Sequence, residues 1–219
     1  MKLKIVSTSD KSETLYTERF DEHYHSIHGA LQESKHIFIQ TGLNHCQKNS
    51  IKIFEVGFGT GLNTILTYAE SIKKNLTIEY TAIELYPVEL NIVNQLNYLE
   101  FLPEESKNIF KLFHSCNWDE KIKISENFSF QKIESDFNKY NFSQKIDLIY
   151  FDAFAPEKQP DMWRVENFIK LFNSLNKNGI LTTYSSKGLV KNNLRQAGFL
   201  VKRLPGPPGK RHILRATKE

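Results

Sequence analysis

The segment from Glu55 to Gly61 has the residue types and spacing of a ligand-binding loop. Its glycines let the backbone turn sharply and let main-chain amides approach a ligand that side chains would keep away. A dinucleotide loop would need its third glycine at position 62, where Leu62 stands, and a phosphate loop would need Gly-Lys-Ser/Thr, so both are excluded. Rather than a purely structural turn, we expect a cofactor loop formed by Glu55, Gly57, Gly59, Gly61 and Asn63.

Two further polar residues end later apolar segments. Glu84 closes Tyr80-Thr-Ala-Ile-Glu84, where a carboxylate can accept both hydroxyls of a ribose. Asp136 is expected to accept from an adenine amino group, with Phe137 or Ile133 against the ring. A G-x-G-x-G loop led by an acidic residue, with this downstream carboxylate, is typical of methyltransferases that use S-adenosylmethionine (SAM). The pattern therefore predicts SAM as the cofactor.

A third carboxylate, Asp152, follows the apolar segment Ile146–Phe151 and opens a loop that contains Pro156 and Pro160. Methyl transfer is a displacement at carbon, so much of the catalysis is alignment. An amine nucleophile must first lose a proton, and a carboxylate can orient the ammonium and accept that proton. We predict Asp152 to be this catalytic group; the alternative is an aspartate that only caps its loop.

Aromatic and basic residues near the predicted strand ends are candidates for substrate contacts. Phe154, Trp163 and Tyr184 are expected to stack on a base, although a core position is the alternative for each. Lys210 and Arg211 follow Gly206-Pro-Pro-Gly209 on a short turn, where phosphate contact and a solvated turn are both open. The last 33 residues hold nine Lys and Arg and one acidic residue, which favours a nucleic acid partner over a merely soluble surface.

Other catalytic classes are less well supported. His23, His25, His28 and His36 lack the cysteines or carboxylates that would complete a metal site, so no metal is expected. Ser185 lacks the G-x-S-x-G surroundings of a nucleophilic serine.

The elements that must position these residues alternate between strands and helices. A hairpin is predicted over 1–18 and a helix over 26–40, followed by a polar linker over 43–50. Further helices are predicted over 62–74, 87–98, 105–114, 161–176 and 187–197. Strands are predicted over 51–56, 76–85, 128–133, 146–151, 179–184, 199–204 and 212–217. This order predicts an α/β, Rossmann-like class I methyltransferase fold: a seven-stranded, mostly parallel sheet with an antiparallel last strand.

Bulk properties agree with one globular unit. The chain has 219 residues, a formal net charge of +4 and two distant cysteines, Cys46 and Cys116. We divide it into an N-terminal hairpin and helix extension, 1–45, and a methyltransferase domain, 46–219. Neither a signal peptide nor a transmembrane segment is apparent, and without a disulfide framework a reducing cytoplasm is the expected location.

Four segments resemble one family. Asp152-Ala-Phe-Ala-Pro156-Glu-Lys-Gln-Pro160-Asp-Met-Trp163 is the most specific of them. The others are the glycine loop Gly57–Asn63, the entry segment Phe20–Tyr24 with Gly29–Glu33 and Phe38, and Gly206–Arg211. Together they resemble the bacterial tRNA 5-aminomethyl-2-thiouridine methyltransferases, which occur alone or as half of a bifunctional wobble-uridine modification enzyme.

The resemblance implies methyl transfer from SAM to the exocyclic amine of 5-aminomethyl-(2-thio)uridine at the tRNA wobble position, giving 5-methylaminomethyl-(2-thio)uridine. Gly57, Gly59, Gly61, Asn63, Glu84 and Asp136 carry over as cofactor contacts, and Asp152 as the residue facing the amine. The partner would be the anticodon stem-loop, bound with the help of Tyr24, Phe154, Pro156, Trp163, Tyr184, Lys210 and Arg211. No flavin domain is present in this chain, so another route must supply the aminomethyl group. Methylation of another RNA or a small amine, and a silent SAM-binding module, are the alternatives.

Overall fold

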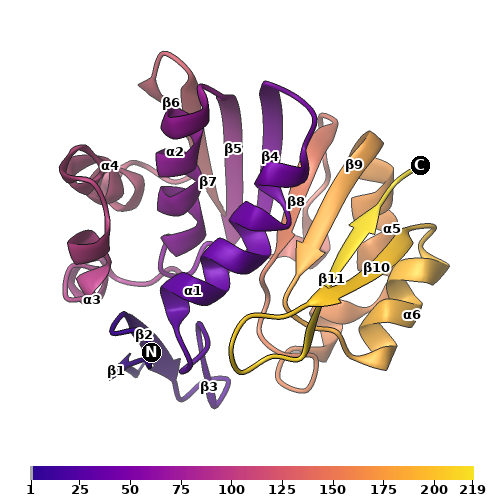
Figure 1. Ribbon diagram of the computed structural model, residues 1–219, viewed down its shortest axis with the longest axis horizontal. Helices are drawn as coiled ribbons and strands as arrows, with labels where there is room; N and C mark the ends of the chain where they lie inside the picture. Colours follow the sequence, from indigo (N-terminus) through magenta and orange to yellow (C-terminus); the bar gives the residue numbers. More distant parts are fainter. Residues whose placement is uncertain (1) are drawn as a thin grey trace.

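The structure, a computed structural model, describes residues 2–219, leaving aside the side chain of Glu105 (Figure 1). A small three-stranded sheet precedes a large eight-stranded one. The small sheet is antiparallel and consists of β1 (Leu3–Ser7), β2 (Glu13–Thr17) and β3 (Glu22–His23). The predicted hairpin over 1–18 is confirmed, because β1 and β2 pair around a turn.

The large sheet has the order β10-β11-β9-β8-β4-β5-β7-β6. Its central strands run parallel, whereas β6 pairs antiparallel with β7, and β11 pairs antiparallel with both β9 and β10. Every residue of β8 is buried, as expected for a central parallel strand. The strands are β4 (Ser50–Val56), β5 (Thr77–Glu84), β6 (Lys121–Ser125), β7 (Phe128–Glu134), β8 (Ile146–Phe151), β9 (Leu175–Thr183), β10 (Leu200–Pro205) and β11 (His212–Thr217).

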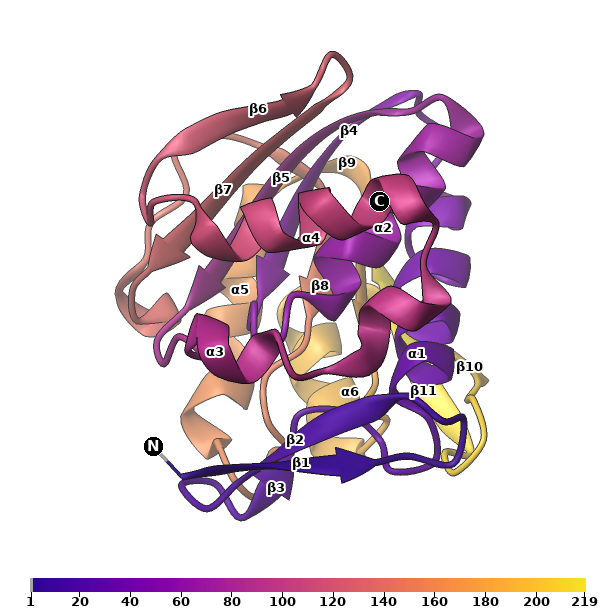
Figure 2. The same ribbon diagram turned by 90° about the vertical axis from the view of Figure 1, so that its left-hand side faces the viewer.

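Helices cover both faces of this sheet (Figures 1 and 2). The α-helices are α1 (Ala30–Ser34), α2 (Leu62–Lys74), α3 (Leu90–Val93), α4 (Glu104–Ser115), α5 (Val165–Ser174) and α6 (Gly188–Gln196). A π-helix, η1 (Lys35–Gln40), continues α1. The 3₁₀ turns are η2 (Leu43–His45), η3 (Asn97–Phe101), η4 (Phe137–Lys139) and η5 (Pro160–Trp163).

Two hydrophobic clusters form the core, one on each face of the sheet. Successive side chains of a strand point to opposite faces, so Ile53 of β4 joins the cluster beneath α2 and α4, while Phe54 joins the cluster beneath α5 and α6. Leu31 and Ile37 of the N-terminal extension belong to the first cluster. The extension and the sheet therefore share a core, and the division at residue 46 stays a prediction.

The predicted strand count was one too low. β6 lies at the sheet edge within a stretch of mixed pattern, and none of its five residues is fully buried. An exposed edge strand lacks the buried alternation by which strands are recognised. The α/β, mostly parallel architecture is confirmed, with eight strands in place of seven.

The helix predicted over 87–98 was also wrong. The chain forms only the single turn α3 and then η3, because tertiary contacts replace the helix. The backbone N–H of Asn97 donates to Glu13 Oε2 at 3.0 Å, and the Asn97 side chain donates to the Lys11 carbonyl at 2.9 Å. The helix predicted from residue 26 begins at Ala30 instead.

The small sheet lies across the edge of the large sheet where the parallel strands end (Figure 2). The loop between β10 and β11 reaches the same edge, next to α1 and β3 (Figure 1). Segments from both ends of the chain thus meet where ligands collect in open α/β folds. Among residues 2–219, no helix has the length and apolar character needed to cross a membrane.

Candidate functional site

One cavity of about 590 Å³ lies at this edge, within the range of small-molecule sites. Its wall has two sides. The ends of β4, β5 and β7 supply the glycine loop, Glu84 and Asp136, and the N-terminal extension together with the β8 end supplies Tyr24, Asp152 and Phe154. The sheet therefore brings most of the predicted site residues to one space.

The glycine loop adopts backbone conformations that favour glycine. Gly57, Gly59 and Gly61 have φ angles of +94°, +50° and +72°. A Cβ on Gly57 would lie 2.7 Å from the Asp152 carbonyl oxygen, so the loop and the β8 end approach each other too closely for a side chain. Gly57 and Gly59 line the cavity, whereas Gly61 caps the start of α2 behind it.

Glu84 stands at the end of β5 and lines the cavity. Its Oε2 accepts from the Gly59 N–H at 3.0 Å, and its Oε1 accepts from the Tyr86 N–H at 2.9 Å. Burial raises the pKa of the Glu84 carboxyl, and these backbone hydrogen bonds oppose the rise. Each carboxylate oxygen can accept more than one hydrogen bond, so capacity remains for two ligand hydroxyls.

Asn63 links two carboxylates, the buried Glu55 and the half-buried Asp152. Its Nδ2 donates to Glu55 Oε1 at 2.9 Å and to Asp152 Oδ2 at 2.8 Å. Glu55 does not line the cavity. Its Oε2 accepts from Tyr80 at 2.9 Å and Thr64 at 3.1 Å, and burial raises the pKa of Glu55 to about 8. Glu55 therefore supports Asn63 from behind the cavity wall.

Asp152 lies on the cavity wall, as the predicted catalytic position requires. Burial raises the pKa of its carboxyl to about 7. The Asn63 hydrogen bond and the Lys210 charge lower that pKa, and the Glu33 charge raises it. A carboxyl that titrates near neutral pH is suited to proton transfer.

Asp136 and Phe137 follow β7 and line the cavity beside Glu84. Asp136 Oδ1 accepts from the Asn138 backbone N–H at 2.9 Å and so begins η4. Phe137 is 3 % exposed, with one side against Phe54 and Phe151. Ile133 lies outside the cavity wall.

Aromatic rings line the side of the cavity that lies across from the glycine loop and Glu84. The Phe154 ring stacks on Phe20 at 4.5 Å between centroids and meets the Tyr24 ring edge-on at 5.0 Å. The Ala155 N–H donates to Glu22 Oε2 at 2.9 Å, and Lys158 pairs with Asp21 at 2.8 Å. The N-terminal segment and the loop after Asp152 are thus joined by stacking, a hydrogen bond and an ion pair.

Tyr184, at the end of β9, lines the cavity and donates its hydroxyl to the Ala153 carbonyl at 2.9 Å. Trp163 and Pro156 lie behind this wall. Trp163 is 1 % exposed, packs on Phe151 and donates Nε1–H to the Phe154 carbonyl at 2.7 Å. Trp163 therefore holds the position of Phe154 from within the core.

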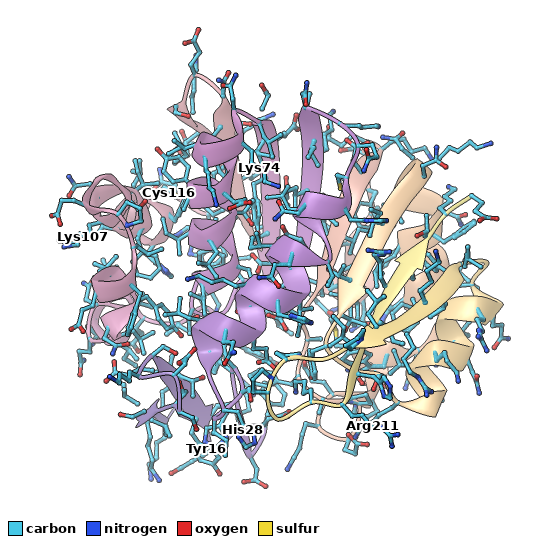
Figure 3. The ribbon with its side chains drawn as sticks, in the orientation of Figure 1. Tyr16, His28, Lys74, Lys107, Cys116 and Arg211 are labelled. Carbon is cyan, nitrogen blue, oxygen red and sulfur yellow. The ribbon has the colours of Figure 1, made fainter. Side chains whose placement is uncertain are left out.

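The two basic candidates point in different directions. Lys210 lines the cavity, with Nζ 3.2 Å from Glu33 Oε1 and 4.8 Å from the Tyr184 ring centroid. Arg211 is exposed and lies at the same edge of the molecule as His28 (Figure 3). Adjacent residues on one turn thus contact the cavity and solvent respectively.

Of His23, His25, His28 and His36, the first two line the cavity. His25 is buried, and burial lowers its pKa to about 4; His36 Nε2 lies 2.9 Å from the Pro205 carbonyl oxygen. In the part of the chain that the structure describes, no group of three or more His, Cys, Asp or Glu is arranged to hold a metal ion.

Of the predicted site residues, eleven line the cavity: Gly57, Gly59, Asn63, Glu84, Asp136, Phe137, Asp152, Phe154, Tyr24, Tyr184 and Lys210. Glu55, Gly61, Pro156, Trp163 and Arg211 lie outside its wall. Our site prediction did not include Glu33, Phe20 and Glu22, which face the cavity from the N-terminal extension. Their only sequence signal was membership of the entry segment.

Comparison with known proteins places the chain among methyltransferases. The family described as S-adenosyl-L-methionine-dependent methyltransferase matches residues 98–219. The bifunctional protein MnmC of Campylobacter fetus, named for tRNA 5-methylaminomethyl-2-thiouridine biosynthesis, is 29 % identical over 218 residues, covering 95 % of this chain and 35 % of that protein. MnmC of Leptospira interrogans is 29 % identical, covering 92 % and 33 %. The chain thus spans about a third of the length of these relatives.

Among solved structures, MNMC2 of Aquifex aeolicus has a TM-score of 0.79 at 26 % identity, covering 98 % of this chain and 70 % of that one. Spermidine synthase of Thermotoga maritima has a TM-score of 0.58 at 12 % identity, covering 100 % and 75 %, which reflects the fold alone.

Proposed function

This chain belongs to the family of S-adenosyl-L-methionine-dependent methyltransferases, and we propose that its acceptor is the exocyclic amine of 5-aminomethyl-(2-thio)uridine. The uridine would be the wobble base of a tRNA, and the product 5-methylaminomethyl-(2-thio)uridine. Support comes from the names of the relatives, which cover the chain almost entirely, and from the chemistry of the cavity.

The observation that carries the proposal is the position of Asp152. Its carboxylate lies on the wall of the cavity shared by the glycine loop and the aromatic residues, and burial raises its pKa to about 7. A protonated amine that enters this cavity can transfer a proton to Asp152, which frees the nitrogen lone pair. The cofactor supplies an electrophilic methyl group on a sulfonium, so the C–N bond forms as the C–S bond breaks.

The chain's residues fit the cofactor. Gly57 and Gly59 line the cavity with backbone that carries no side chain, and Glu84 retains acceptor capacity for ribose hydroxyls. We propose that these residues, with Asn63, Asp136 and Phe137, hold S-adenosylmethionine. Glu55 and Gly61 would act indirectly, by supporting Asn63 and the start of α2.

The aromatic side would hold the nucleobase. A wobble base must be turned out of its stack to reach a cavity, and aromatic rings then replace its neighbours. We propose that Tyr24, Phe154 and Tyr184 provide these surfaces, supported by Trp163 and Pro156, and that exposed Arg211 contacts phosphates of the anticodon stem-loop. Residues 1–45 would then serve as the substrate side of the site, in a cytoplasmic enzyme.

The test is incubation of the purified protein with methyl-labelled SAM and tRNA from a bacterium that cannot complete this modification, followed by digestion to nucleosides. We expect label in 5-methylaminomethyl-(2-thio)uridine. Label in another nucleoside would refute the acceptor but keep the reaction class. No label, in protein shown to bind SAM, would favour a small amine acceptor or a silent module.

A further inference from the structure

A cation already occupies part of the cavity wall. Lys210 Nζ lies 3.2 Å from Glu33 Oε1 and 4.8 Å from the centroid of the Tyr184 ring. A carboxylate beside an aromatic face is a favourable environment for an ammonium group. Glu33, Tyr184, Lys210 and Asp152 all line the same cavity, so this environment belongs to the space where the acceptor amine must react.

The fold fixes the orientation of the Glu33 carboxylate. Glu33 lies on α1 and is 8 % exposed. Its Oε2 accepts from the Ser26 N–H at 2.7 Å, whereas among residues 2–219 its Oε1 meets no donor at hydrogen-bond geometry. The ion pair with Lys210 thus supplies the positive charge that compensates the negative charge on Oε1. Burying a carboxylate is costly unless a cation or donor accompanies it, so Oε1 requires such a partner.

The partner comes from a different segment of the chain than α1. Lys210 belongs to the turn between β10 and β11, and its side chain is 28 % exposed while that of Glu33 is 10 % exposed. The turn closes through the Lys210 N–H to the Pro207 carbonyl at 2.9 Å, independently of the lysine side chain. The cation is therefore the more exposed member of the pair, at the end of a long side chain, and the carboxylate is the member that a backbone N–H holds in place.

We infer that Glu33 is the residue that selects a protonated amine as substrate, by binding its ammonium group in the position that Lys210 Nζ takes in this structure. The inference rests on the proposed function and deepens it. Asp152 accepts the proton, and Glu33 holds the charged amine beforehand. Lys210 keeps the buried carboxylate balanced until the substrate arrives.

A binding test separates this role from turnover. Two synthetic anticodon stem-loops carry either 5-aminomethyluridine or the neutral 5-hydroxymethyluridine at the wobble position, and fluorescence anisotropy measures each Kd with S-adenosylhomocysteine present. The wild type should prefer the amine form by about tenfold or more, the usual effect of a hydrogen bond between charged groups. Glu33→Gln, which retains an acceptor for the Ser26 N–H, should lose that preference, and Lys210→Met should increase it.

A matched control is Glu157→Gln. Glu157 lies on the loop after Asp152 outside the cavity wall and pairs with Lys187, so its loss removes an equal charge without touching the amine position. This variant should keep the wild-type preference.

The pH profile provides a second readout that a structural role would not produce. The groups that act on Asp152 are Asn63, Glu33 and Lys210, with Glu55 and Tyr184 also in its electrostatic range. Because Glu33 raises the pKa of Asp152 and Lys210 lowers it, Glu33→Gln should move the acidic limb of kcat/KM to lower pH and Lys210→Met should move it to higher pH.

The outcomes are distinguishable. An amine preference that vanishes in Glu33→Gln, without methyl transfer by the wild type, would refute the proposed function and leave Glu33 as the residue that binds an ammonium group. Methyl transfer with the same amine preference in wild type and Glu33→Gln would overturn the inference alone. No amine preference in the wild type, or no binding of either stem-loop, would also overturn it.

Discussion

The two sides of the cavity are assembled differently. On the cofactor side, the Gly59 N–H reaches Glu84 across 25 positions of sequence, within one strand-helix-strand unit. On the substrate side, the Ala155 N–H reaches Glu22 across 133 positions, and His36 reaches the Pro205 carbonyl across 169. The first side is a local motif, and the second exists only when distant segments are folded together.

The two sides of the cavity should therefore respond differently to substitutions. A local motif depends on backbone conformation at a few glycines, so small steric changes there affect it directly. A composite wall depends on contacts between separate elements, so single side chains in it can be changed while the sheet stays intact. Variants can therefore separate cofactor binding from acceptor chemistry.

The largest effect is expected for Asp152→Asn. Asparagine keeps an oxygen acceptor for the Asn63 amide but cannot take a proton, so kcat should fall by about 10²- to 10⁴-fold, the usual contribution of a general base. Calorimetric titration should give an unchanged Kd for SAM, which would separate the two sides. Turnover near the wild-type rate with SAM bound would show that Asp152 has no catalytic role.

Gly57→Ala should disrupt the cofactor side. The φ of +94° and the 2.7 Å approach of a Cβ to the Asp152 carbonyl oxygen both oppose a side chain. The backbone strain alone costs about 1–3 kcal/mol, so we expect a lower Tm and weaker SAM binding.

The control is Gly188→Ala at the start of α6, where a Cβ would meet no atom within 4 Å. Its Tm should equal or slightly exceed that of the wild type. Equal behaviour of both alanine variants would contradict the steric account.

Glu55→Gln tests the connection between the two sides. Burial raises the pKa of Glu55 from 4.5 to about 8, so the folded state holds a proton that the unfolded chain releases. Stability should therefore fall as pH rises from about 4.5 towards 8. Glutamine mimics the neutral acid, so the variant's Tm should decline less than that of the wild type between about pH 6 and 8.5. Parallel Tm curves would mean that Glu55 is ionised in the folded protein.

Arg211→Ala should have the smallest effect. One lost phosphate contact should weaken tRNA binding modestly and reduce the slope of log K against log salt by about 1. Lys74→Ala is the control, because Lys74 is exposed at the end of α2, far from Arg211 (Figure 3). Identical salt slopes for the two variants would remove Arg211 from the tRNA interface.

Sequence patterns predicted the cofactor side better than the substrate side, for a physical reason. Glycine spacing and strand ends are local signals, and they placed Gly57, Glu84 and Asp136 at the cavity. Glu55 lies behind the wall because a strand alternates its faces, and position 55 points its side chain towards α2. Trp163 and Phe154 share one loop, but only packing decides that Phe154 faces the cavity and Trp163 the core.

Glu33 could not be assigned from its surroundings in the sequence. The residue types in Gly29–Glu33 do not predict that Lys210, far away in the sequence, pairs with Glu33. The edge strand β6 was missed for a related reason. None of its residues is buried, so its sequence lacks the alternation that marks a strand. Positions defined by long-range neighbours need the fold before their chemistry can be interpreted.

The meeting of both chain ends at one edge has a consequence during synthesis. The segment that contains α1 is synthesised before the turn between β10 and β11, so Glu33 receives its cation only after that turn has left the ribosome. Until then, α1 would expose a carboxylate without its partner, and the acceptor wall would lack Lys210. A nascent chain can thus form its glycine loop early, while the wall with Glu33 and Lys210 is complete only after the turn between β10 and β11 has been synthesised.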